Sequence, residues 1–343
     1  MEGDRDGAGR AASAPRLLIT ESDVLALRAR HGLGRAEHVA AVEAAWREQA
    51  DGTAALLDRQ SLVTDPDPDA PRPRSFKLLC AALARRGVIA TVTYAAGYGR
   101  PLDYRIQLCS AATGRLMSII EGEAVSHWST GAVTAAATRA LAREDARVLA
   151  LVGTGTYAFD QATFIAQVRP IVEVRCFGRD AARRTAFAAR LAEALPAVRV
   201  RAVADVQSAI DGADIVTTVT TSHTPVFDGA LLRPGVHVNA IGMHYPRTRE
   251  VDSDTVRRSR VFVDDVAQTF EEKGEILIPL ASGEIARDHV LGPMSAVLSG
   301  AIAGRRTAED LTLFASGGTA IEKAAVAALI DERARAAGVG RPL

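Results

Sequence analysis

The clearest chemical signal in the chain is a turn of small residues at 153–158, which reads GTGTYA. It follows the apolar run VLALV and precedes a helical pattern that begins FDQATF. In a strand, turn and helix unit, Gly153 permits the tight turn, Gly155 lets backbone N–H groups approach a pyrophosphate, and Ala158 lets the helix sit close to the strand. The turn therefore predicts a dinucleotide site, and a strand–helix turn without a ligand is the alternative. The expected cofactor contacts here are Gly153, Thr154, Gly155, Thr156, Tyr157 and Ala158.

The choice of dinucleotide is expected to depend on the residues that end the next strand. An Asp or Glu about twenty residues beyond the glycine turn would bind the ribose 2′-hydroxyl of NAD. Here Gly178 and Arg179 occupy that place, and Asp180 follows. An arginine suits a 2′-phosphate, so the sequence favours NADP(H) over NAD(H). Two alternatives stay open: Arg179 stacks on the adenine or lies in solvent, and Asp180 is a ribose ligand or a helix cap.

The elements around the turn predict how it is positioned. Short apolar strands alternate with helices through the middle of the chain, which is typical of a parallel sheet covered on both faces. Before it, β-branched segments separated by turn residues predict an antiparallel meander, and residues 306–337 are expected to be helical. The expected parallel strands are 148–153, 171–178, 198–203, 213–220, 235–242 and 260–265, and the meander strands are 87–99, 103–111 and 115–122.

The bulk composition narrows the class of partner. The 343 residues suffice for two domains, and 41 Lys and Arg balance 41 Asp and Glu, so no net charge favours nucleic acid or an anionic membrane. Cys80, Cys109 and Cys176 are expected to be reduced thiols, the histidines show no metal-ligand spacing, and residues 1–15 lack the apolar core of a signal peptide. We expect a cytoplasmic protein with a small-molecule or peptide-type substrate and no metal.

Several segments together resemble the ornithine cyclodeaminase and mu-crystallin family. They are TGAVTAAATRALAR, LVGTGTYAFDQ, GADIVTTVTTSHTPVFDG, LLRPGVHVNAIGMHYPRTREVD and LTLFASGGTAIEKAA. The resemblance implies a Rossmann-type α/β dinucleotide-binding domain at 131–305 and a discontinuous α+β domain, made from 16–130 and 306–343, that binds substrate and forms a homodimer. Residues 1–15 are expected to be a disordered N-terminus.

The resemblance also implies a substrate site that has changed in this chain. In members that act on amino acids, a lysine on the meander and an arginine of an RT[GA]A motif hold the carboxylate, and an aspartate assists proton transfer. Val92, Ser129 and His244 stand at those three positions. Because a bound carboxylate needs a replacement for its lost solvation, we expect a neutral or masked group there, another cation such as Lys77, Arg100 or Lys273, or loss of catalysis.

The candidate site residues follow from these segments. His244 is the first candidate for proton transfer because imidazole titrates near neutral pH, although a structural role is an equal alternative. Lys323 stands where the family usually has an aspartate, so it adds a cation near the site or faces water. The further catalytic candidates are Tyr94 and His127; the substrate-binding candidates are Val92, Tyr98, Arg100, Ser129 and Lys273; and the remaining cofactor contacts are Arg179, Thr220, Thr221, Ser222, Gly242, Met243, Ser316 and Gly318.

These features predict an NAD(P)H-dependent reductase of an imine, or less readily a ketone, in specialised metabolism or peptide modification. Its substrate would lack an α-carboxylate held by the lysine and arginine that other family members use. The first alternative is a binding protein like mu-crystallin, which holds NADPH and a small ligand without turnover. Cyclodeaminase action on ornithine or lysine is the second alternative, and it would need the carboxylate anchors that Val92 and Ser129 replace.

Overall fold

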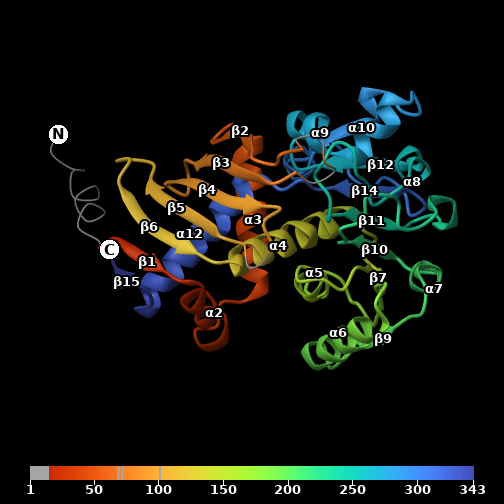
Figure 1. The fold of residues 1–343 in the computed structure, drawn as a ribbon, viewed down its shortest axis with the longest axis horizontal. Coiled ribbons are helices and arrows are strands. Elements are labelled where there is room, and N and C mark those ends of the chain that lie inside the picture. The colour runs from red at the N-terminus through yellow and green to blue at the C-terminus, as the bar shows by residue number, and fades with distance from the viewer. Residues whose placement is uncertain (1–14, 68–69, 71–72, 100–101) are drawn as a thin grey trace.

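The computed structural model describes residues 15–67, 70, 73–99 and 102–343, and it contains two sheets joined by helices. The first sheet has the strand order β15-β1-β6-β5-β4-β3-β2 (Figure 1). Strands β2 to β6 form an antiparallel meander. The predicted strands β4, β5 and β6 are confirmed, whereas β2 and β3 were not predicted, and β1 adds to β6 in parallel. The bounds are β1 Leu17–Ile19, β2 Ala54–Val63, β3 Ser75–Leu83, β4 Val88–Ala96, β5 Tyr104–Ser110, β6 Leu116–Glu121 and β15 Arg341–Pro342.

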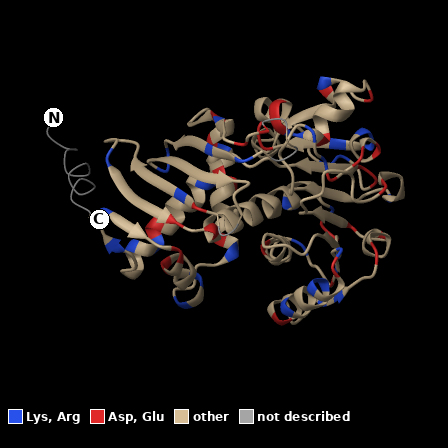
Figure 2. Cartoon of the chain, in the orientation of Figure 1, with Lys and Arg blue, Asp and Glu red and all other residues tan. Residues whose placement is uncertain are grey.

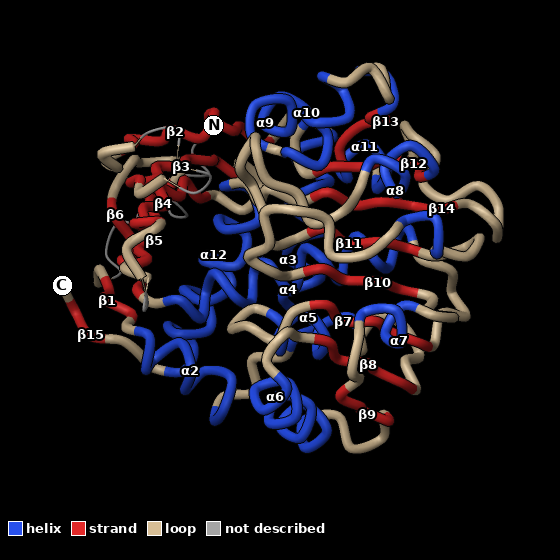
Figure 3. Tube along the Cα trace, turned by 45° about the vertical axis from the view of Figure 1, so that its right-hand side comes forward, coloured by secondary structure: helices blue, strands red, loops and turns tan. Residues whose placement is uncertain are grey.

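The second sheet is parallel and has the order β13-β12-β14-β11-β10-β7-β8-β9. Separate hydrophobic clusters cover its two faces, as the alternation of strands and helices predicted. Figure 3 shows the strands of this sheet side by side among helices. All six predicted strands are present, and the α/β fold is confirmed. The bounds are β7 Val148–Val152, β8 Glu173–Phe177, β9 Arg199–Ala202, β10 Ile215–Thr218, β11 His237–Ala240, β12 Ser259–Val263, β13 Val290–Pro293 and β14 Leu311–Ala315.

Strand β14 corrects the expectation that residues 306–337 are helical. All five residues of β14 are buried, and the strand lies between β11 and β12 in the second sheet. A run that is apolar on both faces fits a central parallel strand, and its length is too short to separate strand from helix by periodicity. The helix α12 (Ala320–Ala337) begins only after Thr319, which caps it. The chain therefore returns to the first sheet near Thr319 and not at 306.

Helices α4 and α12 join the two halves. Helix α4 (Glu123–Leu141) leads from the meander to the second sheet, and α12 packs back against α3, β3 and β4 (Figure 1). Helix α2 begins after Thr20, whose side chain caps it. The other helices are α2 Glu21–Arg30, α3 Arg35–Ala50, α5 Ala158–Ile165, α6 Ala181–Ala194, α7 Val206–Ile210, α8 Ser253–Arg258, α9 Val266–Glu272, α10 Gly274–Ala281 and α11 Met294–Leu298.

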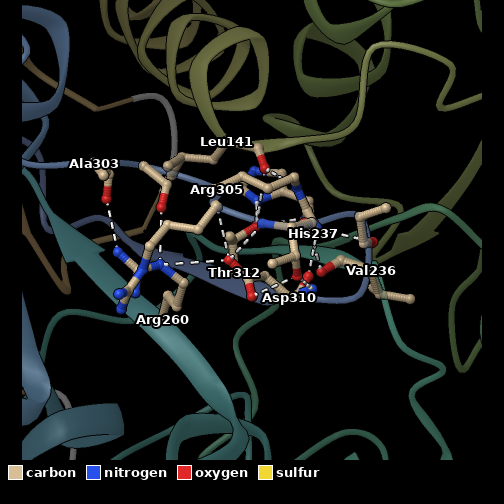
Figure 4. A network of polar contacts seen from close by, with 12 residues as sticks. Leu141, Val236, His237, Arg260, Ala303, Arg305, Asp310 and Thr312 are labelled. Carbon is tan, nitrogen blue, oxygen red and sulfur yellow. Dashed lines mark hydrogen bonds and ion pairs between the residues drawn. The ribbon is translucent and has the colours of Figure 1, made fainter.

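A buried polar network anchors the amino-terminal edge of the second sheet (Figure 4). The His237 Nδ1 atom lies 2.9 Å from Thr312 Oγ1, and its Nε2 atom lies 3.0 Å from Asn239 Oδ1. Arg305 Nε donates to the Leu141 carbonyl at the end of α4, at 2.8 Å. Burial lowers the pKa of His237 to about 3, so the ring is neutral. His237 is therefore a hydrogen-bonded core residue.

Candidate functional site

The turn at 153–158 has the backbone geometry that a dinucleotide site needs. Gly153 has φ of 116°, and a Cβ atom there would lie 2.5 Å from the Val219 carbonyl oxygen, so only glycine fits. A Cβ at Gly155 would meet nothing within 4 Å, so the backbone is open on the side where phosphates would approach. Ala158 is fully buried as the first residue of α5. The residues present therefore fit a pyrophosphate.

The position of Gly178 lies against the Thr154 side chain of this turn, which favours a glycine there. A Cβ at Gly178 would lie 2.5 Å from Thr154 Oγ1, so an acidic residue there would require the Thr154 side chain to move. Asp180 accepts a hydrogen bond from Arg183 N at 2.9 Å and caps α6, which settles its role as a helix cap. Arg179 is exposed beside this cap, and Arg184 donates to the Gly178 carbonyl at 2.6 Å.

Glu250 joins the loops that follow β10 and β11. Its carboxylate accepts hydrogen bonds from Thr220 N at 2.5 Å, Gly242 N at 2.6 Å and Thr218 Oγ1 at 3.0 Å. Burial raises the pKa of Glu250, Glu275 raises it further, and the donors from Thr220 and Gly242 lower it. This fully buried clamp positions the predicted cofactor segment 220–222 beside Gly242 and Met243. The sequence analysis did not single out Glu250, although the residue lies in a segment that carried the resemblance.

Asp264 holds the turn that contains Ser316 and Gly318. Its Oδ2 atom accepts from Ser316 Oγ at 2.8 Å and from Gly317 N and Gly318 N, each at 2.7 Å. Burial, together with the neighbouring Glu322 carboxylate, raises the pKa of Asp264 to about 7, although the hydrogen bonds from this turn lower it. Since β10, β11, β12 and β14 are parallel, this turn lies at the same edge of the sheet as the glycine turn.

Lys273 ties two of these loops together. Its Nζ atom donates to the Met243 carbonyl and to the Ser316 carbonyl, the latter at 3.0 Å, and it pairs with Glu275 at 3.4 Å. The residue has no exposed surface. Lys273 therefore acts as a buried link and is not placed to replace a substrate anchor.

A row of polar side chains crosses the inner face of the meander. Ser61, Lys77, Tyr94 and Tyr104 are cross-strand neighbours on β2 to β5. Lys77 Nζ donates to Ser61 Oγ at 2.7 Å, and the rings of Tyr94 and Tyr104 stack with centroids 5.5 Å apart. Burial lowers the pKa of Lys77 and raises that of both tyrosines, so Tyr94 and Tyr104 are neutral hydrogen-bond donors near pH 7.

The loop after β11 closes on this row. Lys77 Nζ lies 5.8 Å from the centroid of the Tyr245 ring, and the half-buried His244 ring stacks on Tyr245 at 4.7 Å. The structure thus brings His244 and Tyr94, which the sequence proposed for chemistry, into one cluster around Tyr245. They come from different sheets, so the site lies where the two halves of the molecule meet.

Helix α4 supplies the side of the cluster nearest the glycine turn. Ser126 Oγ lies 2.9 Å from the Tyr157 hydroxyl, and the His127 ring lies 4.3 Å from the Tyr157 ring. Ser129 is fully buried and receives a hydrogen bond of 2.7 Å from Lys323 Nζ. Burial lowers the pKa of Lys323 to about 8. Lys323 is therefore enclosed beside Ser129 and does not face water.

Three other candidates are not at this cluster or are not described. Val92 lies on the same face of β4 as Tyr94 but has 0% exposure and packs in the hydrophobic core, so it offers no surface to a ligand. Tyr98 is 54% exposed and bonds through its hydroxyl to Thr64. Arg100 and the N-terminal residues 1–14 lie outside the described residues.

Arg59 is a site residue that sequence reasoning missed. It lies at an irregularity in the pairing of β2 with β3, and its side chain is 4% exposed. Its Nη1 donates to Glu272 Oε2 at 2.8 Å, and its Nη2 donates to the carbonyls of Gly317 and Gly318, the former at 2.8 Å. Arg59 thereby links the meander to the turn held by Asp264. The strand β2 was not predicted, so the sequence offered no reason to place this arginine in the site.

Charges and possible metal ligands complete the description. Basic and acidic residues are interspersed over both halves of the molecule (Figure 2). Among the described residues no group of three His, Cys, Asp or Glu side chains could hold a metal ion. Within the same part of the chain, no helix has the length and apolar character needed to cross a membrane.

The parallel sheet and the glycine turn define a dinucleotide-binding α/β protein, and a second, mostly antiparallel sheet faces the turn-bearing half with a row of polar side chains. The chain belongs to the ornithine cyclodeaminase/mu-crystallin family, whose model matches residues 76–338. It is an NAD(P)-dependent oxidoreductase related to imine reductases.

Individual relatives agree with this assignment. A Delta(1)-pyrroline-2-carboxylate reductase of Colwellia psychrerythraea is 33% identical over 229 residues, which are 67% of this chain and 72% of that protein. The structure of the Thermococcus litoralis Delta(1)-pyrroline-2-carboxylate reductase in complex with NADH and L-proline matches 95% of this chain and 100% of that one, with a TM-score of 0.89 and 28% identity. An archaeal alanine dehydrogenase dimer with bound NAD matches 96% and 98%, with a TM-score of 0.86 and 25% identity.

Proposed function

We propose that the protein is an NADPH-dependent reductase of an imine, or less readily a ketone. The observation that carries the proposal is the meeting of two sets of residues. Tyr157 of the glycine turn contacts Ser126 on α4, and His244, from the loop after β11, joins the row that contains Lys77 and Tyr94 through Tyr245. A cofactor in the glycine turn would thus lie beside side chains able to move a proton.

In this mechanism the nicotinamide, when bound, supplies a hydride to the carbon of the C=N bond. The protein has to hold the substrate and provide the proton that the nitrogen gains. His244 is half-buried and adjoins the Tyr245 ring, so its imidazole is proposed as the proton donor. Tyr94 stays protonated because burial raises its pKa, and it is proposed to orient the substrate by donating a hydrogen bond. His127, against Tyr157, is proposed to border the same site.

The substrate is proposed to differ from a small α-imino acid held in the pose that the resemblance implies. Val92 lies in the core and Ser129 is neutral, so neither provides a cation at its position. A small molecule of specialised metabolism or a modified peptide is the proposed class. The competing function is an NADPH-binding protein without turnover, and the replacements at Val92 and Ser129 favour it as well. The NADPH oxidation assay described below distinguishes the two functions.

NADPH is proposed as the preferred cofactor. The support is that Gly178 offers no carboxylate to a ribose 2′-hydroxyl and that Arg179 is exposed beside it. An exposed guanidinium can pair with a 2′-phosphate at little desolvation cost. The ratio of kcat/KM for NADPH to that for NADH tests this preference.

A homodimer is proposed through the outer face of the first sheet. Leu57, Leu62, Phe76 and Leu78 are large apolar residues, between 41% and 68% exposed, on neighbouring strands β2 and β3. A contiguous apolar surface at a sheet edge favours association with a second copy. Light scattering should give the mass of a dimer, and Leu62→Glu should shift the measured mass toward that of the monomer.

A cytoplasmic location is proposed because Cys80, Cys109 and Cys176 are free thiols.

The reductase proposal is tested with purified protein, NADPH and a panel of cyclic imines and ketones. We expect NADPH oxidation with at least one imine, and a fall in kcat of about 10²- to 10⁴-fold for His244→Ala with an unchanged NADPH affinity. Tyr94→Phe should raise KM more than it lowers kcat. Tight NADPH binding without hydride transfer to any panel member would instead support the binding-protein function.

A further inference from the structure

An ion pair joins helix α2, near the start of the chain, to helix α5. Arg28 Nη1 donates to Asp160 Oδ1 at 3.3 Å, and the two side chains are 21% and 10% exposed. Asp160 lies in the first turn of α5, the helix that follows the glycine turn. The pair therefore connects α2 to the helix whose N-terminus would receive the cofactor phosphates.

Aromatic rings hold the Arg28 guanidinium beside Asp160. Its Cζ atom lies 4.1 Å from the centroid of the Trp128 ring and 5.4 Å from that of Phe164. Trp128 lies on α4, and Phe164 lies on α5 one turn after Asp160. The Nε and Nη2 atoms of Arg28 are buried and make no hydrogen bond to a described residue. The orientation of this guanidinium is therefore set by the rings and by the ion pair.

A second arginine adds positive charge around Asp160. Arg35 is the first residue of α3, and its Cζ atom lies 5.8 Å from the centroid of the Phe164 ring. Burial and the nearby Arg35 lower the pKa of Arg28 to about 10, and Asp160 opposes this shift. Burial also lowers the pKa of Arg35, which Asp160 again opposes. Arg28 therefore stays protonated near pH 7, and its charge balances that of Asp160.

The charge of Asp160 matters because of its place in α5. The N-terminus of a helix carries a partial positive charge, which attracts a carboxylate in the first turn as well as a bound phosphate. An ionised Asp160 without a counter-ion would repel the phosphates of a cofactor held at this helix end. Arg28 removes that repulsion, and it needs no contact with the cofactor to do so.

We propose that Arg28 is a positioning residue for the dinucleotide: it neutralises Asp160 and thereby keeps the N-terminus of α5 available to the cofactor phosphates. The proposal rests on the dinucleotide part of the proposed function and is independent of hydride transfer. It extends the cofactor site to α2, which carries no dinucleotide motif.

The test compares NADPH dissociation constants, measured by fluorescence titration, for the wild type and for variants of this pair. Arg28→Met removes the charge and keeps much of the apolar length of the side chain, so it should weaken NADPH binding by about tenfold. Arg30→Met is the matched control because Arg30 is exposed on the same helix, and it should bind NADPH within about twofold of the wild type. Arg28→Met combined with Asp160→Asn should regain the wild-type affinity to within about threefold.

Asp160→Asn alone separates this role from that of an ordinary structural ion pair. Loss of a structural pair would weaken NADPH binding from either side, whereas removal of the carboxylate charge should leave NADPH binding as tight as in the wild type or tighter. This variant also decides the question if the thermal midpoint shows that Arg28→Met does not fold. An Arg28→Met protein with the affinity of the control, a double variant as weak as Arg28→Met, or weaker binding by Asp160→Asn would each overturn the proposal.

Failure of the reductase function gives a different result. A protein that shows the expected NADPH affinities but transfers no hydride contradicts the reaction and leaves the role of Arg28 in place. A wild type that binds no NADPH contradicts both the proposed cofactor and this role.

Discussion

Glu250→Gln is predicted to weaken both the fold and cofactor binding, although the two side chains have nearly the same shape. In the structure the two carboxylate oxygens accept three hydrogen bonds, from Thr220 N, Gly242 N and Thr218 Oγ1. Glutamine has a single acceptor oxygen. If that oxygen takes the place of Oε2, it keeps the bonds from Gly242 and Thr218, and its NH₂ group then faces the N–H of Thr220.

The magnitude follows from that single unsatisfied donor. A buried N–H without an acceptor costs about 1–3 kcal/mol, so the free energy of unfolding should fall by about that amount. Glu250→Ala removes all acceptors and should cost roughly 3–5 kcal/mol, if the protein folds. Because the clamp joins the loops that carry residues 220–222 and Gly242, we expect the NADPH dissociation constant of Glu250→Gln to rise by about tenfold or more.

Urea unfolding followed by circular dichroism measures the first effect, and fluorescence titration with NADPH measures the second. Glu271→Gln is the matched control, because Glu271 is exposed on α9. It should change neither quantity by more than about 0.5 kcal/mol. A Glu250→Gln protein with the unfolding free energy and NADPH affinity of the control would refute the role assigned to the clamp.

Three further predictions follow from single residues. The pKa of His237 is about 3 in the folded protein and near 6.5 in the unfolded chain, so the unfolded state binds a proton first as the pH falls. This group should therefore lower the wild-type free energy of unfolding by about 1.4 kcal/mol per pH unit below pH 6.5. Urea titrations at pH 7 and pH 5 should show a smaller loss of stability for His237→Gln than for the wild type. Gly153→Ala should fail to fold or to bind NADPH, whereas Gly155→Ala should keep its thermal midpoint and lose NADPH affinity, since only the first Cβ would clash. Arg179→Ala should lower kcat/KM with NADPH by about tenfold or more and leave kcat/KM with NADH unchanged, and equal losses would contradict the 2′-phosphate contact.

The elements that were predictable from the sequence are those specified by local patterns. The six strands from 148 to 265 are short apolar runs that alternate with helices, and one of the two roles left open for Asp180, a helix cap, follows from residue type at a helix start. Strand β14 was missed because five consecutive buried residues carry no period, and only the neighbours β11 and β12 fix them as a strand.

The site was less predictable because its contacts connect distant segments. Arg59 meets Glu272 and the Gly317 carbonyl across more than two hundred residues, at 2.8 Å each. Lys323 could be identified as a cation in the family's aspartate position, but its approach to Ser129 depends on how α12 packs against α4. Val92, chosen by alignment of the meander, is a core residue because its cross-strand neighbour Leu79 is buried and apolar, whereas Tyr94 on the same face pairs with Lys77.

The central claim is that the two halves of the molecule meet to transfer a hydride from NADPH to an imine. The most direct test is to incubate the protein with NADPH that carries deuterium at the transferred position of the nicotinamide and with the panel of imines. The account predicts that mass spectrometry finds one deuterium on the former imine carbon of an amine product, and that His244→Ala slows its appearance. Bound cofactor with no deuterium in any amine product would contradict the account.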